Sequence, residues 1–123
     1  MNNLIVSEYQ ECKTFWQWVC VKGYADDVIK NANERMGDTG WFIRALYAIG
    51  FRKGLPDYHY IVRNNHWSSL WIEVKRRDQR TKKQRPEQVE WQERLRKRGH
   101  AAEFAYGCDD AIQIFERYVS NDL

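Results

Sequence analysis

The sequence predicts an α/β fold, and two observations lead to that prediction. Residues 58–62 and 70–74 are rich in β-branched and aromatic side chains and flank a polar turn, which is the pattern of a β-hairpin. Segments with apolar residues at helical spacing and recognisable ends, such as 7–23 and 86–99, lie before and after that hairpin. With 123 residues we expect one domain spanning 1–123.

The first helix is expected over 7–23. Residues 7–10 have the Ser-x-x-Gln pattern of a capping box, and Gly23 can end a helix. An acid at Glu8, in the first turn, is sufficiently explained by the helix dipole. The apolar side of this helix is expected to carry Cys12, Phe15, Trp16 and Val19.

A short strand and a second helix are expected next. The strand covers 28–32. The helix has Asp38 or Thr39 as its cap and Gly50 at its end, and it is apolar around most of its circumference. We therefore expect this helix to lie in the core or at a dimer surface.

The chain approaching the hairpin presents an acid at a strand start. Gly54 permits a close backbone approach, and Pro56 fixes the backbone just before Asp57. His59 shares the face of Asp57, and two interpretations stay open: a contact to substrate or to a bound water, or, as for most single histidines, no such role.

The C-terminal part is expected to add a helix, a strand and a helix. Pro86 suits the first turn of the first of these helices, and Gly99 can end it. A strand is expected over 101–106, and the final helix is expected to be capped by Asp109 or Asp110.

The hairpin brings together two acids and a lysine. Alternate side chains of a strand share a face, so Glu73 and Lys75 project together, and Asp57 comes from the start of the partner strand. Neighbouring carboxylates repel each other and are costly to desolvate, which is tolerable mainly when a divalent cation sits between them. A lysine beside them can orient or deprotonate water. A lone Glu-x-Lys is usually a solvated strand face, but joined to Pro-Asp at this spacing it predicts metal-dependent cleavage of a phosphodiester.

The net charge of +3 is unevenly distributed. Residues 75–98 contain eleven Lys or Arg against four acids, which leaves the rest of the chain at −4. Such a block is often only a solvated face, but this one begins at Lys75. We expect its first part to neutralise DNA phosphates in a salt-dependent way, through Arg76, Arg77, Arg80, Lys82, Lys83 and Arg85.

Cysteine usage and hydropathy indicate an intracellular protein. The three cysteines, Cys12, Cys20 and Cys108, form no Cys-x-x-Cys pair, so neither a disulfide framework nor a zinc site is indicated. No apolar stretch approaches the ~20 residues that cross a bilayer. We expect a cytoplasmic protein with no membrane partner.

Three motifs together resemble the VRR-NUC family of the PD-(D/E)xK nuclease superfamily: GLPD at 54–57, WIEVK at 71–75 and PEQVEW at 86–91. The resemblance covers nearly the whole chain, and it includes the acid-bearing first helix and Asn33-Glu34, whose role stays open. It implies a restriction-endonuclease-like core, with a mixed central sheet flanked by helices. Small stand-alone members are often phage-borne and resemble Holliday-junction resolvases. The resemblance thus implies a metal-dependent endonuclease that prefers branched DNA, located in the cytoplasm of a bacterial host if it is phage-borne.

The resemblance also implies roles for individual residues. Asp57, Glu73 and the Val74 carbonyl are expected to hold Mg2+ or Mn2+, with Glu8 joining through water or a second ion. Glu11, one turn further along, is the substitute for Glu8. Lys75 is expected to orient or activate the attacking water, with help from Gln88. The other interpretation of Gln88 is a hydrogen-bonded core amide.

Oligomeric state and two rival functions complete the expectations. A homodimer fits a resolvase-like enzyme, because paired symmetric nicks need two active sites. One rival is a non-catalytic module that binds DNA structures on the same fold. The other is a restriction-like nuclease that reads a short sequence.

Overall fold

The computed structural model describes residues 5–31 and 40–123. The predicted residues Asn33, Glu34, Asp38 and Thr39 lie outside this part of the chain. The elements are, in order, α1 (Glu8–Val21), β1 (Val28–Lys30), α2 (Gly40–Ala48), β2 (Tyr58–Tyr60), β3 (Leu70–Lys75), α3 (Pro86–Lys97), β4 (Ala101–Tyr106) and α4 (Cys108–Val119). Short 3-10 turns lie at Ala25–Asp27 and Arg77–Gln79.

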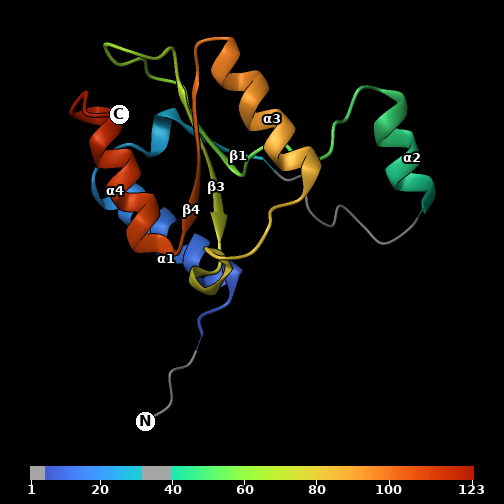
Figure 1. Ribbon diagram of the computed structural model, residues 1–123, viewed down its shortest axis with the longest axis horizontal. Coiled ribbons are helices and arrows are strands. Elements are labelled where there is room, and N and C mark those ends of the chain that lie inside the picture. The colour runs from blue at the N-terminus through green and yellow to red at the C-terminus, as the bar shows by residue number, and fades with distance from the viewer. Residues whose placement is uncertain (1–4, 32–39) are drawn as a thin grey trace.

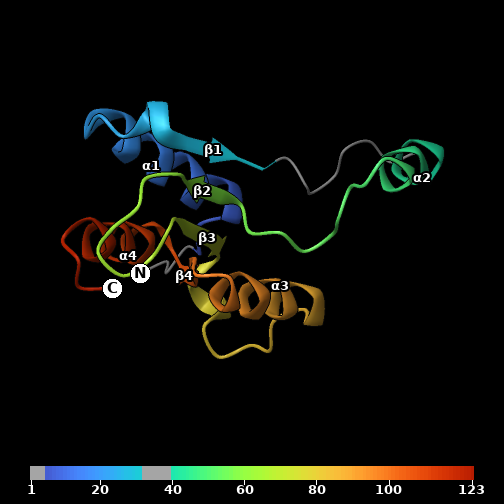
Figure 2. The ribbon, with the colours of Figure 1, turned by 90° about the horizontal axis from the view of Figure 1, so that it is seen from above.

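The four strands form one mixed sheet in the order β1-β2-β3-β4. The β1/β2 and β2/β3 pairs are antiparallel, and the β3/β4 pair is parallel. A parallel neighbour needs a crossover connection, and α3 provides it between β3 and β4. Helices flank the sheet, as Figures 1 and 2 show, and the predicted α/β class with a mixed sheet is confirmed.

The main core lies between the sheet and the pair α1 and α4. Leu70, Ile72 and Val74 alternate along β3 and point to this side, where they are at most 2% exposed. Phe15 of α1 and Phe115 of α4 meet them and each other. The side chains between these positions therefore face the opposite side of the sheet, where α3 packs.

The ends of α1 agree with the predicted signals, and its predicted apolar side is confirmed for Phe15 and Val19 but only in part for Cys12 and Trp16. The Ser7 hydroxyl accepts a hydrogen bond from the Gln10 backbone N–H at 3.1 Å, and Gly23 has a φ of +84° just beyond the helix. The buried positions are Glu11, Phe15 and Val19. The predicted inward residues Cys12 and Trp16 are half-buried, because the helix is rotated toward Glu11.

The predicted capping of the final helix by Asp109 or Asp110 is wrong. Gly107 precedes α4 and no side chain of the helix caps it. The N–H of Cys108 instead donates to the Glu11 carboxylate of α1 at 3.1 Å. Asp110 accepts the N–H of Tyr106 at 2.8 Å, so it fixes the end of β4.

The prediction that the second helix might lie in the core is also wrong. α2 buries none of its residues, and it stands away from the sheet in both views of Figures 1 and 2. Trp41 is 66% exposed and Ile49, just after the helix, is 83% exposed. The dimer-surface interpretation stays a prediction. None of the helices in 5–31 and 40–123 is long and apolar enough to cross a membrane.

Candidate active site

Asp57 is held in place by the strand next to it. Pairing of β2 with β3 ends at Tyr58 opposite Ile72, so the backbone N–H of Val74 lies beyond the ladder. The Asp57 carboxylate accepts that N–H at 2.9 Å through Oδ2, and the Asp57 carbonyl accepts the N–H of Asn31 at 2.7 Å. The side chain is buried, and its orientation is fixed from two sides.

Glu73 is a buried carboxyl in an unfavourable environment for a negative charge. It is 4% exposed on the face of β3 that meets α3. Burial raises the pKa of Glu73, and the negative charges of Asp57 and Glu8 raise it further, while Lys75 lowers it. A positive ion between these acids would stabilise their ionised forms.

Lys75 and Gln88 form a closed set of contacts with Glu73. The Lys75 ammonium lies 3.6 Å from Glu73 Oε2 and donates to Gln88 Oε1 at 2.8 Å. The Gln88 amide in turn donates to Glu73 Oε2 at 3.3 Å. The two-residue spacing on β3 and the start of α3 at Pro86 bring these side chains together.

Lys30 also belongs to the site, and the sequence analysis did not identify it. Its ammonium lies 3.5 Å from Asp57 Oδ1 and donates to the Asn31 carbonyl at 2.9 Å. The antiparallel register that pairs Lys30 with Tyr58 brings it there. The only signal in the sequence is a lysine at the end of a short strand, which does not reveal the register.

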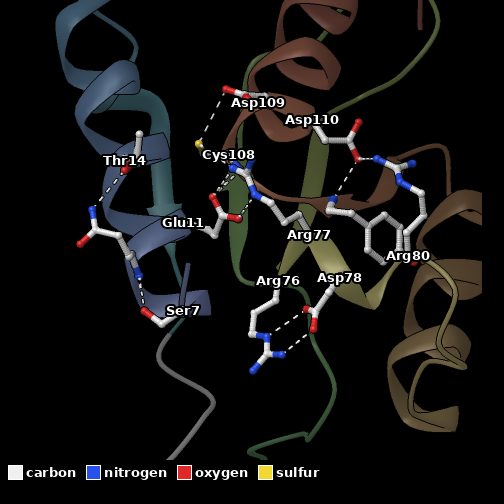
Figure 3. A network of polar contacts seen from close by, with 12 residues as sticks. Ser7, Glu11, Thr14, Arg76, Arg77, Asp78, Arg80, Cys108, Asp109 and Asp110 are labelled. Carbon is white, nitrogen blue, oxygen red and sulfur yellow. Dashed lines mark hydrogen bonds and ion pairs between the residues drawn. The ribbon is translucent and has the colours of Figure 1, made fainter. Parts of the chain in front are cut away.

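The two acids of α1 have different surroundings. Glu8 is half-buried, and its charge acts on Glu73. Glu11 is 1% exposed and accepts two hydrogen bonds from Arg77, at 2.8 and 2.9 Å (Figure 3). The hydrogen bond from Arg77 lowers the pKa of Glu11. Both Glu11 oxygens accept hydrogen bonds from Arg77. Glu8 is therefore better placed than Glu11 to join the predicted metal site.

The predicted DNA-binding residues divide into two groups. Arg76 pairs with Asp78 at 2.6 Å, Arg77 with the buried Glu11, and Arg80 with Asp110 at 3.4 Å (Figure 3). The second group is exposed and forms no ion pair within the described residues: Lys82, Lys83 and Arg85. The first group thus has partners inside the protein, and Arg77 has a structural contact that the sequence did not indicate.

His59 packs against Trp71 on the face that carries Asp57. The two rings stack with their centroids 3.8 Å apart and their planes at 11°. Burial lowers the pKa of His59, which favours the neutral imidazole. Its Nε2 and the Trp71 Nε1 are both buried and have no hydrogen-bond partner among the described residues. The stack gives His59 a packing role.

The oxygen atoms at the site fit a hard divalent cation. Within 5–31 and 40–123, no group of three or more Asp, Glu, His or Cys side chains is gathered closely enough to hold a metal alone. The predicted ligands, Asp57, Glu73 and the Val74 carbonyl, would offer oxygen atoms only. Mg2+ commonly takes one or two carboxylates and fills its other positions with water and phosphate. The observation that matches such an ion is the burial of two neighbouring acids, Asp57 at 3% and Glu73 at 4% exposure, because buried carboxylates favour a positive ion beside them.

Comparison with known proteins identifies a structural relative. No protein-family model matches the sequence, and no curated protein matches it. A solved structure described as a VRR_NUC domain protein superposes with a TM-score of 0.79 at 20% sequence identity, over 95% of this chain and 91% of that one. At this identity the match is evidence for the shared fold, so the chain has the fold of a VRR_NUC domain protein.

Proposed function

We propose that this protein is a VRR-NUC nuclease: a metal-dependent DNA endonuclease that hydrolyses phosphodiester bonds, with branched DNA as its preferred substrate. The single observation that supports this best is the cluster of Asp57, Glu73, Lys75 and Gln88 on a sheet with the fold of a VRR_NUC domain protein. A buried acid pair next to a lysine is a costly arrangement that a phosphodiesterase site explains.

Each residue of the site has a separate role in the proposed hydrolysis. Asp57, Glu73 and the Val74 carbonyl offer the oxygen ligands, with Glu8 nearby on α1. A bound Mg2+ or Mn2+ supplies positive charge that stabilises the anionic transition state at phosphorus. Lys75, held beside the acids, either orients the attacking water through its ammonium N–H groups or, as the neutral amine, accepts a proton from that water.

Gln88 holds Lys75 and Glu73 in position relative to each other. Its carbonyl oxygen accepts from Lys75 and its amide nitrogen donates to Glu73. Lys75 is 13% exposed, so water reaches the site from a limited range of directions. The residues thereby hold the attacking water on one side of the phosphate, as an in-line displacement requires.

The substrate is held mainly through its backbone. Lys82, Lys83 and Arg85 are exposed and lie between Lys75 and Gln88 in the chain, so they neutralise phosphates on either side of the cut. Binding of this kind is salt-dependent and reads little sequence. The enzyme acts as a homodimer, which places two sites on one junction.

A panel of labelled substrates tests this function. A four-way junction, a flap, single strands and linear duplex are incubated with protein in Mg2+ or Mn2+. Lys75→Ala serves as the inactive variant and Lys22→Ala as its matched control, because Lys22 is an exposed lysine at the far end of α1. We expect the wild type and Lys22→Ala to cut the junction and Lys75→Ala to leave it intact.

The other outcomes distinguish the rival functions. Discrete fragments from linear duplex would identify a sequence-reading nuclease. Junction binding without cleavage in any metal would identify a non-catalytic DNA-binding module. Cleavage that persists undiminished in Lys75→Ala would show that the cluster is not the catalytic site.

A further inference from the structure

A cavity of about 560 Å³ lies between the exposed side of α1 and the strands β1 and β2. Five residues of α1 line it, and Lys30 of β1 and Tyr58 of β2 form its opposite wall. Its volume falls within the range of about 300–1,000 Å³ that is usual for ligand sites. We call it the α1 cavity.

The α1 cavity adjoins the candidate active site, because Lys30 contributes to both. Lys30, which lines it, has its ammonium 3.5 Å from Asp57 Oδ1. Tyr58, the first residue of β2, directly follows Asp57. Glu8 lines the cavity at the start of α1. If a phosphate of a nucleic acid lies at the candidate active site beside Asp57, the sugar and base next to that phosphate lie near the α1 cavity.

Two aromatic rings of the cavity, those of Tyr9 and Trp16, have no ring partner within residues 5–31 and 40–123. Tyr9 is 74% exposed and Trp16 is half-buried. Neither ring stacks on another ring in the described part of the chain, whereas the core ring of Phe15 contacts Trp18, Tyr58 and Phe115.

The remaining wall carries a thiol, two lysines and one acid, Glu8. Burial raises the pKa of the Cys12 thiol to about 12, so that side chain stays neutral. Lys13 lines the cavity from the exposed side of α1, and Lys30 lies across from it. Rings flanked by lysines suit a flat group attached to an anionic backbone.

We propose that the α1 cavity holds an unpaired nucleobase of the DNA strand being cut, next to the scissile phosphate. The base stacks on Tyr9 and Trp16, and Lys13 and Lys30 neutralise the adjoining phosphates. This inference rests on the proposed nuclease function and gives a physical basis to a preference for branched DNA. A base paired inside a duplex cannot enter the cavity, whereas a base at a junction or flap can.

The test combines removal of the base with removal of the ring. Wild-type protein first maps the cut position on a branched substrate. A series of substrates then carries a single abasic residue at each position around that cut, or around the branch point if no cut occurs. Affinity is measured by fluorescence anisotropy in Mg2+ with Lys75→Ala protein, which is not expected to cut.

One abasic position is expected to weaken binding about 5- to 150-fold, which corresponds to the ~1–3 kcal/mol of base stacking. Adding Tyr9→Ala should weaken binding of the intact substrate by a similar factor, and the abasic residue should then cause no further loss. Tyr9→Phe should retain the affinity because it keeps the ring. Val21→Ala, at an 84% exposed position of the same helix outside the cavity, is the matched control.

Two results would overturn the inference. One is that no abasic position weakens binding more than the others. The other is that the losses from the abasic residue and from Tyr9→Ala multiply, which would mean that base and ring act independently. Failure of the wild type to cut any DNA would instead count against the nuclease function, and the binding comparison would still be decisive for the cavity.

Discussion

Each of the two central acids lies beside a lysine, and the two lysines have different surroundings. Lys75 is 13% exposed and is held by Gln88, whereas Lys30 is 36% exposed and packs over the Tyr58 ring with its ammonium 5.4 Å from the ring centroid. A proton transfer needs a fixed and partly desolvated group. Lys75 meets that requirement better than Lys30. We therefore propose that Lys75 acts on the attacking water and that Lys30 neutralises negative charge.

Substitution of an acid and of the lysine should separate metal binding from chemistry. Asp57→Ala removes an expected metal ligand, so it should weaken Mn2+ binding and abolish cleavage. Lys75→Ala should bind Mn2+ as the wild type does and lose about 10²–10⁴-fold in cleavage rate. Calorimetric titration with Mn2+ and single-turnover cleavage measure the two effects. Equal loss of metal affinity in both variants would contradict this division of roles.

Glu11 should contribute stability that depends on pH. Its pKa is lowered in the folded protein, chiefly by the hydrogen bond from Arg77. The stabilisation is therefore fully present above about pH 4.5, the ordinary value for this carboxyl, and it is lost as the pH falls through the lower pKa of the folded state. Glu11→Gln should lower the free energy of unfolding by about 1–3 kcal/mol at pH 7.

Urea unfolding of the wild type and Glu11→Gln at pH 7, 5 and 3 measures this dependence. The difference between the two proteins should be similar at pH 7 and 5 and should shrink at pH 3. Glu116→Gln, at an exposed position of α4, is the control and should show a small difference at every pH. A Glu11 difference that is constant down to pH 3 would show that its charge is not responsible.

At the scale of elements, the first turn of α3 depends on a glycine outside it. Gly54 has a φ of +93°, and a Cβ added there would lie 2.8 Å from backbone atoms of Glu87. Gly54→Ala should therefore displace the turn that carries Gln88 and separate it from Lys75. We expect a loss of about 10–100-fold in cleavage, the range typical of residues that position a metal site, together with a lower stability.

Gly50→Ala is the matched control for this substitution. Gly50 also has a positive φ, +107°, but a Cβ there meets nothing within 4 Å. Its replacement should cost only the backbone strain, about 1–2 kcal/mol, and leave the rate of cleavage per folded molecule unchanged. Equal effects of the two substitutions on that rate would mean that the contact with Glu87 does not position Gln88.

Elements that depend on local signals could be predicted from the sequence. The hairpin, the Ser7 cap and the helix after Pro86 are specified by residues within a few positions of each other, and the structure contains them. The placement of Gln88 beside Lys75 came from family resemblance, since no local pattern relates a helix residue to a strand residue thirteen positions away.

Features that depend on long-range contacts could not be predicted. The N–H at the start of α4 is satisfied by Glu11, 97 residues earlier, so the local candidates Asp109 and Asp110 were wrong. Lys30 reaches Asp57 only because of the register of β1 with β2. An apolar pattern shows that a helix needs to be covered by another surface, but it does not identify that surface. For this reason the core was one of the two positions expected for α2, and that alternative was wrong.

At the scale of the whole molecule, α2 is an exposed apolar helix that lies away from the sheet. α2 carries Trp41 and is followed by Ile49, both largely exposed, and it extends away from the rest of the fold (Figure 2). Isolated exposed apolar residues are normal, but a helix without buried residues is stable only when another surface covers it. The homodimer proposed above would supply that surface, and a stable interface buries about 800 Å² on each partner.

Charge placed on this helix should therefore separate the two copies. Trp41→Asp with Ile49→Asp should convert a particle of twice the 14.9 kDa chain mass into one of that mass in light scattering after size exclusion. The matched control is Val21→Asp, an 84% exposed apolar position on α1. A wild type that elutes with the mass of one chain at all micromolar concentrations would contradict the dimer.

The same variant should change the product as well as the mass. Two sites acting on one junction make paired nicks, so wild-type protein should convert a supercoiled plasmid bearing a cruciform directly to the linear form. A single chain keeps Asp57, Glu73 and Lys75, and should therefore nick one strand and accumulate the open circle. Retention of linear product by the separated chains would show that paired cutting does not need the α2 contact.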